Sequence, residues 1–186
     1  MARSDGSKAL LFWPVVVAIV VADQLTKAVA ATALLPRGIP HEVLGQWLRL
    51  TLVYNPGAAF GLHLGPFSRW IFLALTLGAL WILGRLYRQT GTGQIARTLA
   101  IALVCGGAVG NLIDRIRSPL GVVDFIDVGL GDMRWPTFNV ADMAVSTGAF
   151  LLAWVLWGED RKAGESRARE GAGEAARPAH AEGANT

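Results

Sequence analysis

Four long runs of apolar residues, separated by polar segments, dominate the pattern of the chain. The runs cover about residues 9–35, 68–87, 95–116 and 139–157. Each is about as long as an α-helix must be to cross a bilayer. Trp70 and Tyr87 stand at the two ends of the second run and Trp157 closes the fourth, as aromatic residues do at membrane interfaces. We therefore predict a membrane α-helical fold, a bundle of four transmembrane helices.

The first run has a second interpretation, as a cleaved signal peptide. Its basic start and the small-residue triplets at 28–30 and 31–33 resemble the pattern of such a peptide. Asp23 and Lys27, however, interrupt the run before those triplets, and the apolar character resumes through Leu35. We favour a retained first helix over a cleaved leader.

Between the first two runs, about residues 36–67 predict a small β element. From Gln46 to Tyr54 leucines alternate with other residues, which is the period of a half-buried strand. The alternation ends at Asn55, which forms a turn signal with the Pro-Gly pair that follows it. A short sheet lying on the membrane surface suits this segment better than another spanning element.

Composition agrees with a membrane protein, because 53% of the residues are hydrophobic and only 17% are charged. The net charge of +3 comes from Lys and Arg that cluster near helix ends, so we expect no nucleic-acid partner. Basic residues near the N-terminus, within residues 85–97 and after residue 160 all fall on one side of a four-helix arrangement. The positive-inside rule then puts both termini in the cytoplasm and the β element on the extracytoplasmic side.

The chain divides into a membrane domain, residues 1–158, and a C-terminal tail, residues 159–186. The tail is rich in Ala, Gly, Glu and Arg without apolar periodicity, which predicts a disordered cytoplasmic extension. Cys105 stands alone in an apolar run, so we expect it to be buried and not to form a disulfide within the chain. The three histidines lack the spacing of metal ligands, and we expect no metal and no other cofactor.

Polar residues that interrupt or flank the apolar runs meet at one depth of this arrangement. Asp23 and Lys27, near the end of the first helix, are four residues apart in the order that favours an ion pair. Five more polar residues lie on the same side of the membrane, in the third helix, the fourth helix and the loop between them. They are Asn111, Arg115, Asp124, Asn139 and Asp142. Ionisable groups in a bilayer are costly unless they have a partner or a function, so we expect a functional site near the outer leaflet.

Asp124 and Asp142 are the candidate catalytic residues. The set contains two carboxyl groups but neither a Ser-His nor a Cys-His pair. Two neighbouring carboxyl groups do not both ionise readily, so one retains a proton while the other acts as a base. Such a pair can activate water and protonate a leaving amine. Asn139 is a candidate to orient the acids or the substrate, although it is equally suited to cap the fourth helix, as Asn55 is to form its turn.

Five short blocks carry most of these polar residues. In chain order they read DQLTK at 23–27, YNPGAAF at 54–60, GGAVGNLIDR at 106–115, VDFID at 123–127 and FNVAD at 138–142. Together the blocks closely resemble the lipoprotein signal peptidases, or type II signal peptidases, which are bacterial membrane aspartyl proteases. The resemblance spans about residues 9–158 and does not cover the tail.

The resemblance implies an intramembrane aspartyl endopeptidase that removes the signal peptide from prolipoproteins, cleaving before a cysteine that carries diacylglycerol. It implies that Asp124 and Asp142 are the catalytic pair. The residues implied to bind substrate or support the site are Asp23, Lys27, Asn55, Asn111, Arg115 and Asn139. The resemblance also implies a multi-pass protein of the cytoplasmic (inner) membrane that contacts membrane lipid and needs no metal. We expect a monomer.

A small proton-coupled transporter or lipid-binding membrane protein is the alternative function. In it Asp23, Asp124 and Asp142 would titrate or hold a lipid head group. Such a protein predicts polar residues at several depths, repeated halves or broken helices. None of these is evident in the sequence, so we prefer the protease.

Overall fold

Four long helices and a small sheet make up the computed structural model, which describes residues 5–59, 62–63 and 65–175. The helices are α1 (Asp5–Ala33), α2 (Ser68–Gln89), α3 (Ile95–Arg117) and α4 (Val140–Ala175), and the 3-10 helix η1 (Gly65–Phe67) precedes α2. Each long helix contains a stretch that is long and apolar enough to cross a membrane. The four predicted helices are confirmed, and α4 alone extends far beyond its predicted end.

The segment predicted to be disordered is partly helical. α4 continues through residues 159–175, whereas residues 176–186 of the predicted tail lie outside the described residues. Ala, Glu and Arg favour helical backbone, and Arg161 and Glu165 approach to 4.0 Å one turn apart. A lack of apolar periodicity therefore did not exclude a helix here. The chain divides into two compact units, residues 1–152 and residues 153–186, and the sheet and all candidate site residues belong to the first.

Glycines let α3 pack closely against α1 and the start of α4. A Cβ atom added at Gly106 would lie 2.9 Å from Cβ of Ile19 in α1. One added at Gly107 would overlap the carbonyl oxygen of Ala141 in α4. Small residues at such positions let helix backbones approach in a membrane bundle, so α3 lies between its two neighbours without large intervening side chains.

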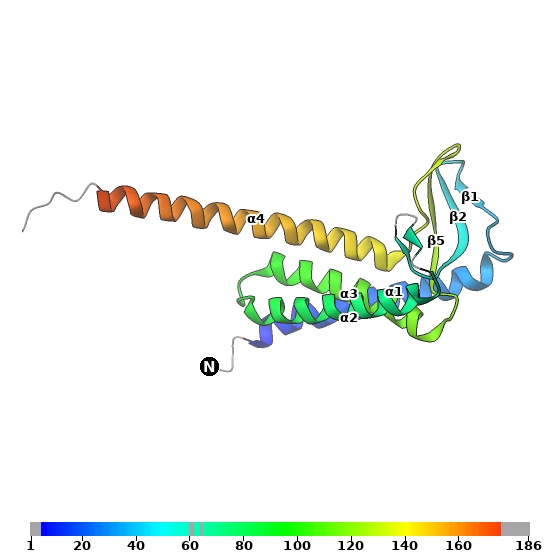
Figure 1. The fold of residues 1–186 in the computed structure, drawn as a ribbon, viewed down its shortest axis with the longest axis horizontal. Coiled ribbons are helices and arrows are strands. Elements are labelled where there is room, and N and C mark those ends of the chain that lie inside the picture. Colours follow the sequence, from blue (N-terminus) through cyan, green and yellow to red (C-terminus); the bar gives the residue numbers. More distant parts are fainter. Residues whose placement is uncertain (1–4, 60–61, 64, 176–186) are drawn as a thin grey trace, which may run out of the picture. The chain divides into compact units, whose positions relative to one another are not determined.

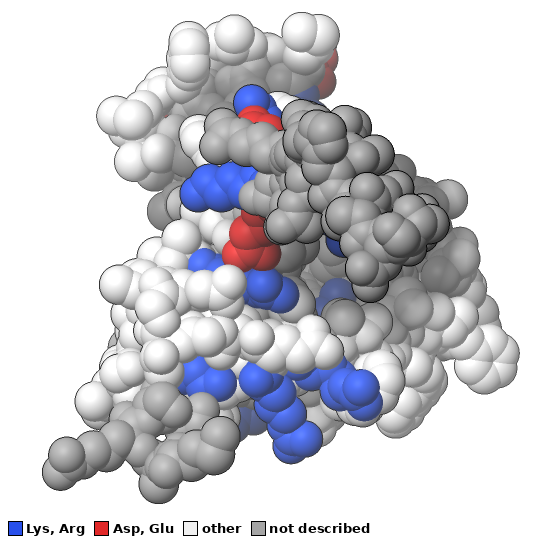
Figure 2. Space-filling model, turned by 90° about the vertical axis from the view of Figure 1, so that its left-hand side faces the viewer, with Lys and Arg blue, Asp and Glu red and all other residues white. Residues whose placement is uncertain are grey.

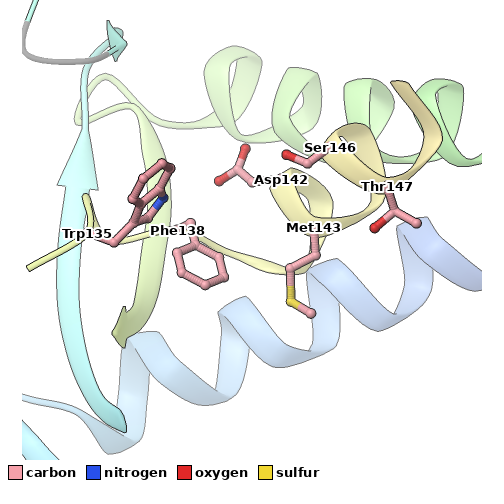
Figure 3. Close-up of a pocket in the computed structure, with 6 residues that line it drawn as sticks. All are labelled: Trp135, Phe138, Asp142, Met143, Ser146 and Thr147. Atoms are coloured by element: carbon pink, nitrogen blue, oxygen red, sulfur yellow. The ribbon is translucent and has the colours of Figure 1, made fainter. Parts of the chain in front are cut away.

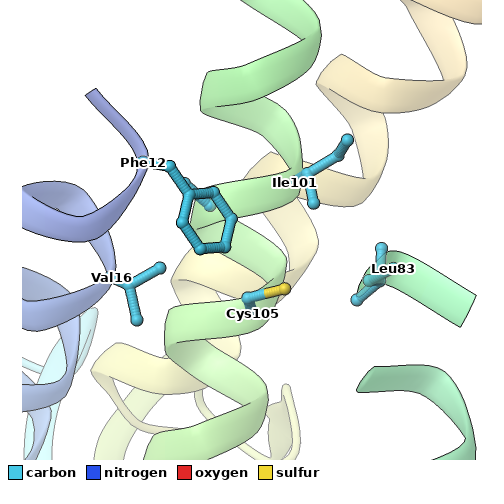
Figure 4. Packing of buried hydrophobic residues seen from close by; sticks show 6 residues of the cluster. Phe12, Val16, Leu83, Ile101 and Cys105 are labelled. Carbon is cyan, nitrogen blue, oxygen red and sulfur yellow. The ribbon is translucent and has the colours of Figure 1, made fainter. Parts of the chain in front are cut away.

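A buried apolar cluster joins α1, α2 and α3 away from the sheet. It includes Phe12 and Val16 of α1, Leu83 of α2, and Ile101 and Cys105 of α3 (Figure 4). The free thiol of Cys105 lies within this cluster, so its expected burial is confirmed.

A four-stranded antiparallel sheet lies at one end of the helix bundle (Figure 1). Its spatial order is β1 (His41–Leu44), β2 (Leu48–Asn55), β5 (Val122–Leu130) and β6 (Met133–Arg134). β3 (Ala58–Ala59) and β4 (Leu62–His63) form a separate two-stranded sheet. The strand predicted at residues 46–54 is confirmed as β2, and residues 60–61 and 64 of the predicted β element lie outside the described residues.

The position expected for Asp124 was wrong in one respect. The sequence interpretation put it in a loop, whereas it lies within β5, opposite Val53 of β2. Residues 122–130 mix five strand-favouring Val, Ile and Phe residues with two aspartates and a glycine, which are depleted in strands. Pairing with a strand some 70 residues earlier in the chain supplies the backbone hydrogen bonds, and only the fold brings that partner near.

The apolar face of the sheet packs on the end of α1. Leu52 is fully buried in a cluster with Ala30 and Leu34 of α1 and Phe125 of β5, and Leu50 packs against the same cluster. The alternation that predicted β2 thus separates a face buried on α1 from a polar face. The sheet is anchored at the helix ends where the polar residues lie.

Candidate active site

Two carboxyl groups lie on either side of one asparagine where the sheet meets α4. Asp124 is the third residue of β5 and is 3% exposed, while Asp142 lies in the first turn of α4. The side-chain Nδ2 of Asn139 donates to Oδ1 of Asp124 at 2.7 Å. The backbone N–H of Asn139 donates to Oδ2 of Asp142 at 3.2 Å. The fold therefore brings the predicted pair of acids together.

Asn139 is also the N-cap of α4. Its Oδ1 accepts the backbone N–H of Asp142 at 2.9 Å, while the carboxylate of Asp142 accepts the backbone N–H of Asn139. This is the reciprocal arrangement of a capping box. The cap and the contact with Asp124 use different atoms of Asn139, so both interpretations of this residue hold.

A second asparagine, Asn111 of α3, completes the link between the acids. Its Nδ2 donates to Oδ1 of Asp142 at 2.8 Å. Its Oδ1 accepts from Nδ2 of Asn139 at 3.1 Å and from Nζ of Lys27 at 2.9 Å. Both asparagine side chains are buried, and their amides are bonded within the network. Buried amides held in this way have one orientation, which fixes the position of the Asp142 carboxylate.

Lys27 is the cation of a buried ionic cluster beside the acids. Its Nζ lies 2.8 Å from Asp23 and 2.9 Å from Asp114, so with Asn111 all three of its N–H donors have partners. The predicted ion pair between Asp23 and Lys27 is confirmed. The other carboxylate oxygen of Asp23 accepts the backbone N–H of Ala141 at 2.9 Å, which ties α1 to the start of α4.

Asp114 and Gln24 belong to this cluster, although the sequence interpretation gave them no role in the site. Asp114 accepts from Nε2 of Gln24 at 3.3 Å and from the backbone N–H of Val123 at 3.2 Å. It therefore connects α1, α3 and β5. The spacing carried a usable signal, because Asp114 follows Asn111 by three residues and a helix puts both on one face.

Asn55 and Arg115 lie at the edge of the site. Oδ1 of Asn55 accepts the backbone N–H of Gly57 at 3.0 Å, and the side chain also hydrogen-bonds to Asp124. Asn55 is thus both a turn residue and a site residue. Arg115 donates to the backbone oxygen of Asn111 at 3.3 Å, and none of its hydrogen bonds to the described residues reaches Asp124. Its guanidinium is close enough to feel the negative charges of Asp142, Asp124 and Asp114.

Asp124 is the acid whose protonation the fold changes most. Burial first, and then the negative charge of Asp142, raises the pKa of Asp124 from 3.8 to about 7. Hydrogen bonds from Asn139 and Asn55 and the charge of Lys27 oppose this shift. The net result is a carboxyl group that keeps its proton over much of the range up to neutral pH.

An apolar hollow of about 400 Å³ opens beside Asp142 (Figure 3). Trp135 and Phe138 line it from the segment before α4, and Met143, Ser146 and Thr147 line it from α4 itself. Asp142 is the one carboxylate among these lining residues. The hollow has the size and apolar lining of a small ligand site, so an apolar group bound there would hold its neighbouring atoms next to this acid.

The chemistry of these groups is that of acids and bases. Among the described residues, no group of three or more His, Cys, Asp or Glu side chains is arranged to hold a metal ion. A buried carboxyl group with a raised pKa stands near a second one held by fixed amide donors. Such a pair can remove a proton from water and donate another to a reacting carbonyl group.

A family model, sequence relatives and solved structures all resemble this chain. A family model described as signal peptidase (SPase) II matches residues 15–158. The lipoprotein signal peptidases of Burkholderia thailandensis and Paraburkholderia phymatum are 37% and 40% identical over 156 residues, 83% of this chain and 92% of theirs. Two solved structures, both described as a bacterial membrane enzyme determined by the in meso method, give TM-scores of 0.71 and 0.68 at 32% and 33% identity. The matches cover 83% and 81% of this chain and 90% and 92% of those chains.

Proposed function

This chain belongs to the signal peptidase II family, and we propose that it removes the signal peptide from diacylglyceryl-modified prolipoproteins, cleaving before the lipidated cysteine. It is an aspartic-type protease and a multi-pass membrane protein with four helices able to span a bilayer. We propose Asp124 and Asp142 as its catalytic pair. The observation that carries this proposal is the pair of hydrogen bonds by which Asn139 holds both carboxyl groups.

In the proposed reaction Asp124 starts as the acid and Asp142 as the base. Burial raises the pKa of Asp124 to about 7, which keeps a proton available on it. Asp142 accepts hydrogen bonds from Asn111 and Asn139 at the N-terminus of α4, which hold its carboxyl oxygens in place. Asp142 removes a proton from water as the water oxygen bonds to the scissile carbonyl carbon. Asp124 gives its proton to the carbonyl oxygen.

Collapse of the resulting diol completes the cleavage. The proton held by Asp142 passes to the leaving amine as the C–N bond breaks. One hydroxyl of the diol returns its proton to Asp124 as the new carboxyl group forms, so both acids regain their starting states. Asn111 and Asn139 hold the acids throughout, and Lys27 offsets the negative charge of the site at its buried side.

We further propose that the acids face the outer leaflet of the cytoplasmic membrane, with both termini in the cytoplasm. Support comes from the sheet, which lies at the same end of the bundle as the acids and exposes Val43, Leu44 and Trp47. Exposed apolar and aromatic side chains of this kind suit the surface of a bilayer. The enzyme would act there as a monomer on lipid-anchored substrates, without a nucleic-acid partner.

The decisive experiment is incubation of the purified protein with a diacylglyceryl-modified prolipoprotein, followed by gel electrophoresis. We expect loss of the signal peptide with the wild-type protein. Asp124→Asn and Asp142→Asn should each remove activity while the protein still binds substrate, because an amide can neither act as the base nor carry the proton. Asp132→Asn, the same change at an exposed acid between β5 and β6, should leave turnover unchanged.

Two outcomes would contradict the proposal. Near-normal turnover of either variant of the pair would remove that residue from the catalytic step. Absence of cleavage by the wild-type protein, together with proton flux driven by substrate, would favour the transport function.

A further inference from the structure

A second hollow, distinct from the one at the acids, opens between α1, α2 and α3. Its volume is about 380 Å³, and its walls include Phe12, Trp13 and Val16 of α1 and Gly84 and Tyr87 of α2. Its lining is mostly apolar and contains one charged side chain, Arg88, near the end of α2. We call it the α1–α2 groove.

The α1–α2 groove is open because of what its walls lack. Gly84 contributes no side chain to the α2 wall, and no other atom lies within 4 Å of the position that a Cβ atom would take there, so the space beside it is open. Phe12 and Val16 point toward Cys105 of α3, which forms the floor (Figure 4). Trp13 lies on the rim and is 59% exposed. An elongated apolar group would therefore enter from the side that faces lipid.

Three cations lie near one end of the groove, of which Arg88 alone lines it. Arg88 lines it, and Arg85 lies one helical turn earlier on α2, with its guanidinium 5.5 Å from the centre of the Trp81 ring. Nζ of Lys8 donates to the backbone oxygen of Thr90 and lies 5.0 Å from the centre of the Tyr87 ring. The lower part of Figure 2, where this end of the bundle faces the viewer, shows several blue side chains among the described residues.

The helices that form the groove offer Arg85 and Arg88 no carboxylate along its length. Residues 8–22 and 68–113 contain no Asp or Glu. Arg88 makes no hydrogen bond or ion pair with any described residue, and the one contact of Arg85 is with Trp81. A cation near the end of a helix is favoured by the helix dipole, but that does not explain why it borders an open apolar groove.

We propose that the α1–α2 groove binds one anionic phospholipid of the surrounding membrane. Its phosphate would lie at Arg88 and Arg85, and part of one acyl chain would lie along the apolar walls. From Arg88 to Leu80 the groove follows eight residues of α2, roughly 12 Å at the rise of an α-helix. Basic pockets between transmembrane helices bind anionic head groups by the same charge attraction.

The test compares retention of phosphatidylglycerol and phosphatidylcholine with identical acyl chains. Purified full-length protein in detergent is mixed with equal amounts of the two lipids, and bound lipid is counted by native mass spectrometry. The wild-type protein should retain phosphatidylglycerol in preference. Arg88→Gln should weaken that binding about fivefold, the effect of one cation at a membrane surface, and leave phosphatidylcholine unchanged. Arg117→Gln, the same loss of charge at the opposite end of α3, should bind like the wild type.

A second pair of variants tests the apolar part of the site. Gly84→Leu fills the groove and should reduce retention of phosphatidylglycerol several-fold. Gly78→Leu makes the same change on α2 where the added side chain also meets open space, but outside the groove, and should have no effect. Melting temperatures measured without added lipid check that each variant is folded. If Gly84→Leu does not fold, the comparison of Arg88→Gln with Arg117→Gln decides the result.

Equal retention of the two lipids by the wild-type protein would overturn the proposal, since the groove would then hold any neighbouring lipid. Equal losses in Arg88→Gln and Arg117→Gln would also overturn it, because they would show an effect of net charge alone.

Discussion

Asn139 both caps a helix and holds a candidate catalytic acid, two roles that separate residues ordinarily have. Its Oδ1 caps α4, and its Nδ2 donates to the buried carboxyl group of Asp124. The side chain is fully buried, so water cannot replace either contact. At the scale of single residues, the stability of the helix start and the position of one acid therefore depend on the same amide.

Replacing Asn139 by Ala should lower both stability and turnover. Loss of the N-cap costs about 1 kcal/mol. Loss of the donor to Asp124 costs about 1–3 kcal/mol more. Displacement of the acids should lower kcat about 100-fold, measured on a lipidated prolipoprotein. Asn139→Ser restores a capping oxygen but not the amide, so it should recover part of the melting temperature and little of the turnover. Recovery of both together would show that the cap alone matters.

The stability of the protein should depend on pH through Asp124. Its pKa is raised from 3.8 to about 7 on folding, so between these values the folded protein holds a proton that the unfolded chain has released. Its contribution to the free energy of unfolding is therefore full below pH 4 and is lost as the pH rises to about 7, by about 1.4 kcal/mol per pKa unit.

Asp124→Asn removes this dependence because an amide does not titrate. The variant should melt at a higher temperature than the wild type at pH 8, and the difference should shrink toward pH 4. Thermal unfolding in detergent over this pH range measures both proteins, with Asp132→Asn as an exposed control. A difference that grows as the pH falls would mean that the pKa of Asp124 is lowered rather than raised.

At the scale of elements, one ion cluster holds the β5–β6 turn on the sheet. Arg134 donates to Asp127 at 2.8 Å, and Thr51 and Arg49 of β2 donate to the same carboxylate at 2.9 Å and 3.1 Å. Burial acts to raise the pKa of Asp127, but these hydrogen bonds and positive charges lower it overall. Because Trp135 directly follows Arg134, the cluster also positions a wall of the hollow beside the acids.

The contact between α3 and α4 should tolerate no side chain at Gly107. An added Cβ atom would overlap the backbone of Ala141, the residue before Asp142. Gly107→Ala should therefore shift the start of α4, cost about 1–3 kcal/mol and lower turnover strongly. Gly78→Ala, in open space on α2, should keep its turnover and stabilise its helix by up to about 1 kcal/mol. Equal behaviour of the two variants in melting and cleavage assays would show that the close contact is unimportant.

At the scale of the whole molecule, the carboxylates of residues 8–152 all belong to the half of the bundle that carries the sheet, whereas cations lie at both of its ends. The ionic cluster of Asp23, Lys27 and Asp114 reaches the sheet through Asp114, which accepts the backbone N–H of Val123 in β5. Arg85 and Arg88 lie near the end of α2 that leads into the short connection to α3. This division supports the orientation proposed for the protein, because uncompensated cations favour the cytoplasmic side.

Cysteine labelling should show the sheet end on the outside of the cell. Single cysteines at Gln46 and Asp132, both exposed, in a Cys105→Ala background should react with an impermeant thiol reagent on intact cells. A cysteine at the exposed Thr92, between α2 and α3, should react only after the membrane is permeabilised. Labelling at Thr92 with protection of the other two positions would invert the orientation.

The helices could be predicted from the sequence because a bilayer leaves few alternatives. Backbone groups in lipid must satisfy their hydrogen bonds within the segment, so a long apolar run of the right length predicts a helix. β2 could be predicted for a related reason, since its leucines alternate with the period of a strand that buries one face. β5 could not, because it pairs with β2 across some 70 residues and local composition does not reveal that partner.

The candidate residues could likewise be predicted from the sequence, through their spacing and the family resemblance. Most contacts between their side chains could not. Helical spacing predicted the pair Asp23 and Lys27, because such contacts depend on local geometry. Tertiary structure decided three other contacts. Asn139 holds both acids, Asp114 shares Lys27, and Arg115 bonds to neither Asp124 nor Asp142. These contacts join separate helices and a strand, and their distances follow from how closely the glycines let those elements pack. The sequence thus determined which groups are present at the membrane boundary, and packing determined which of them touch.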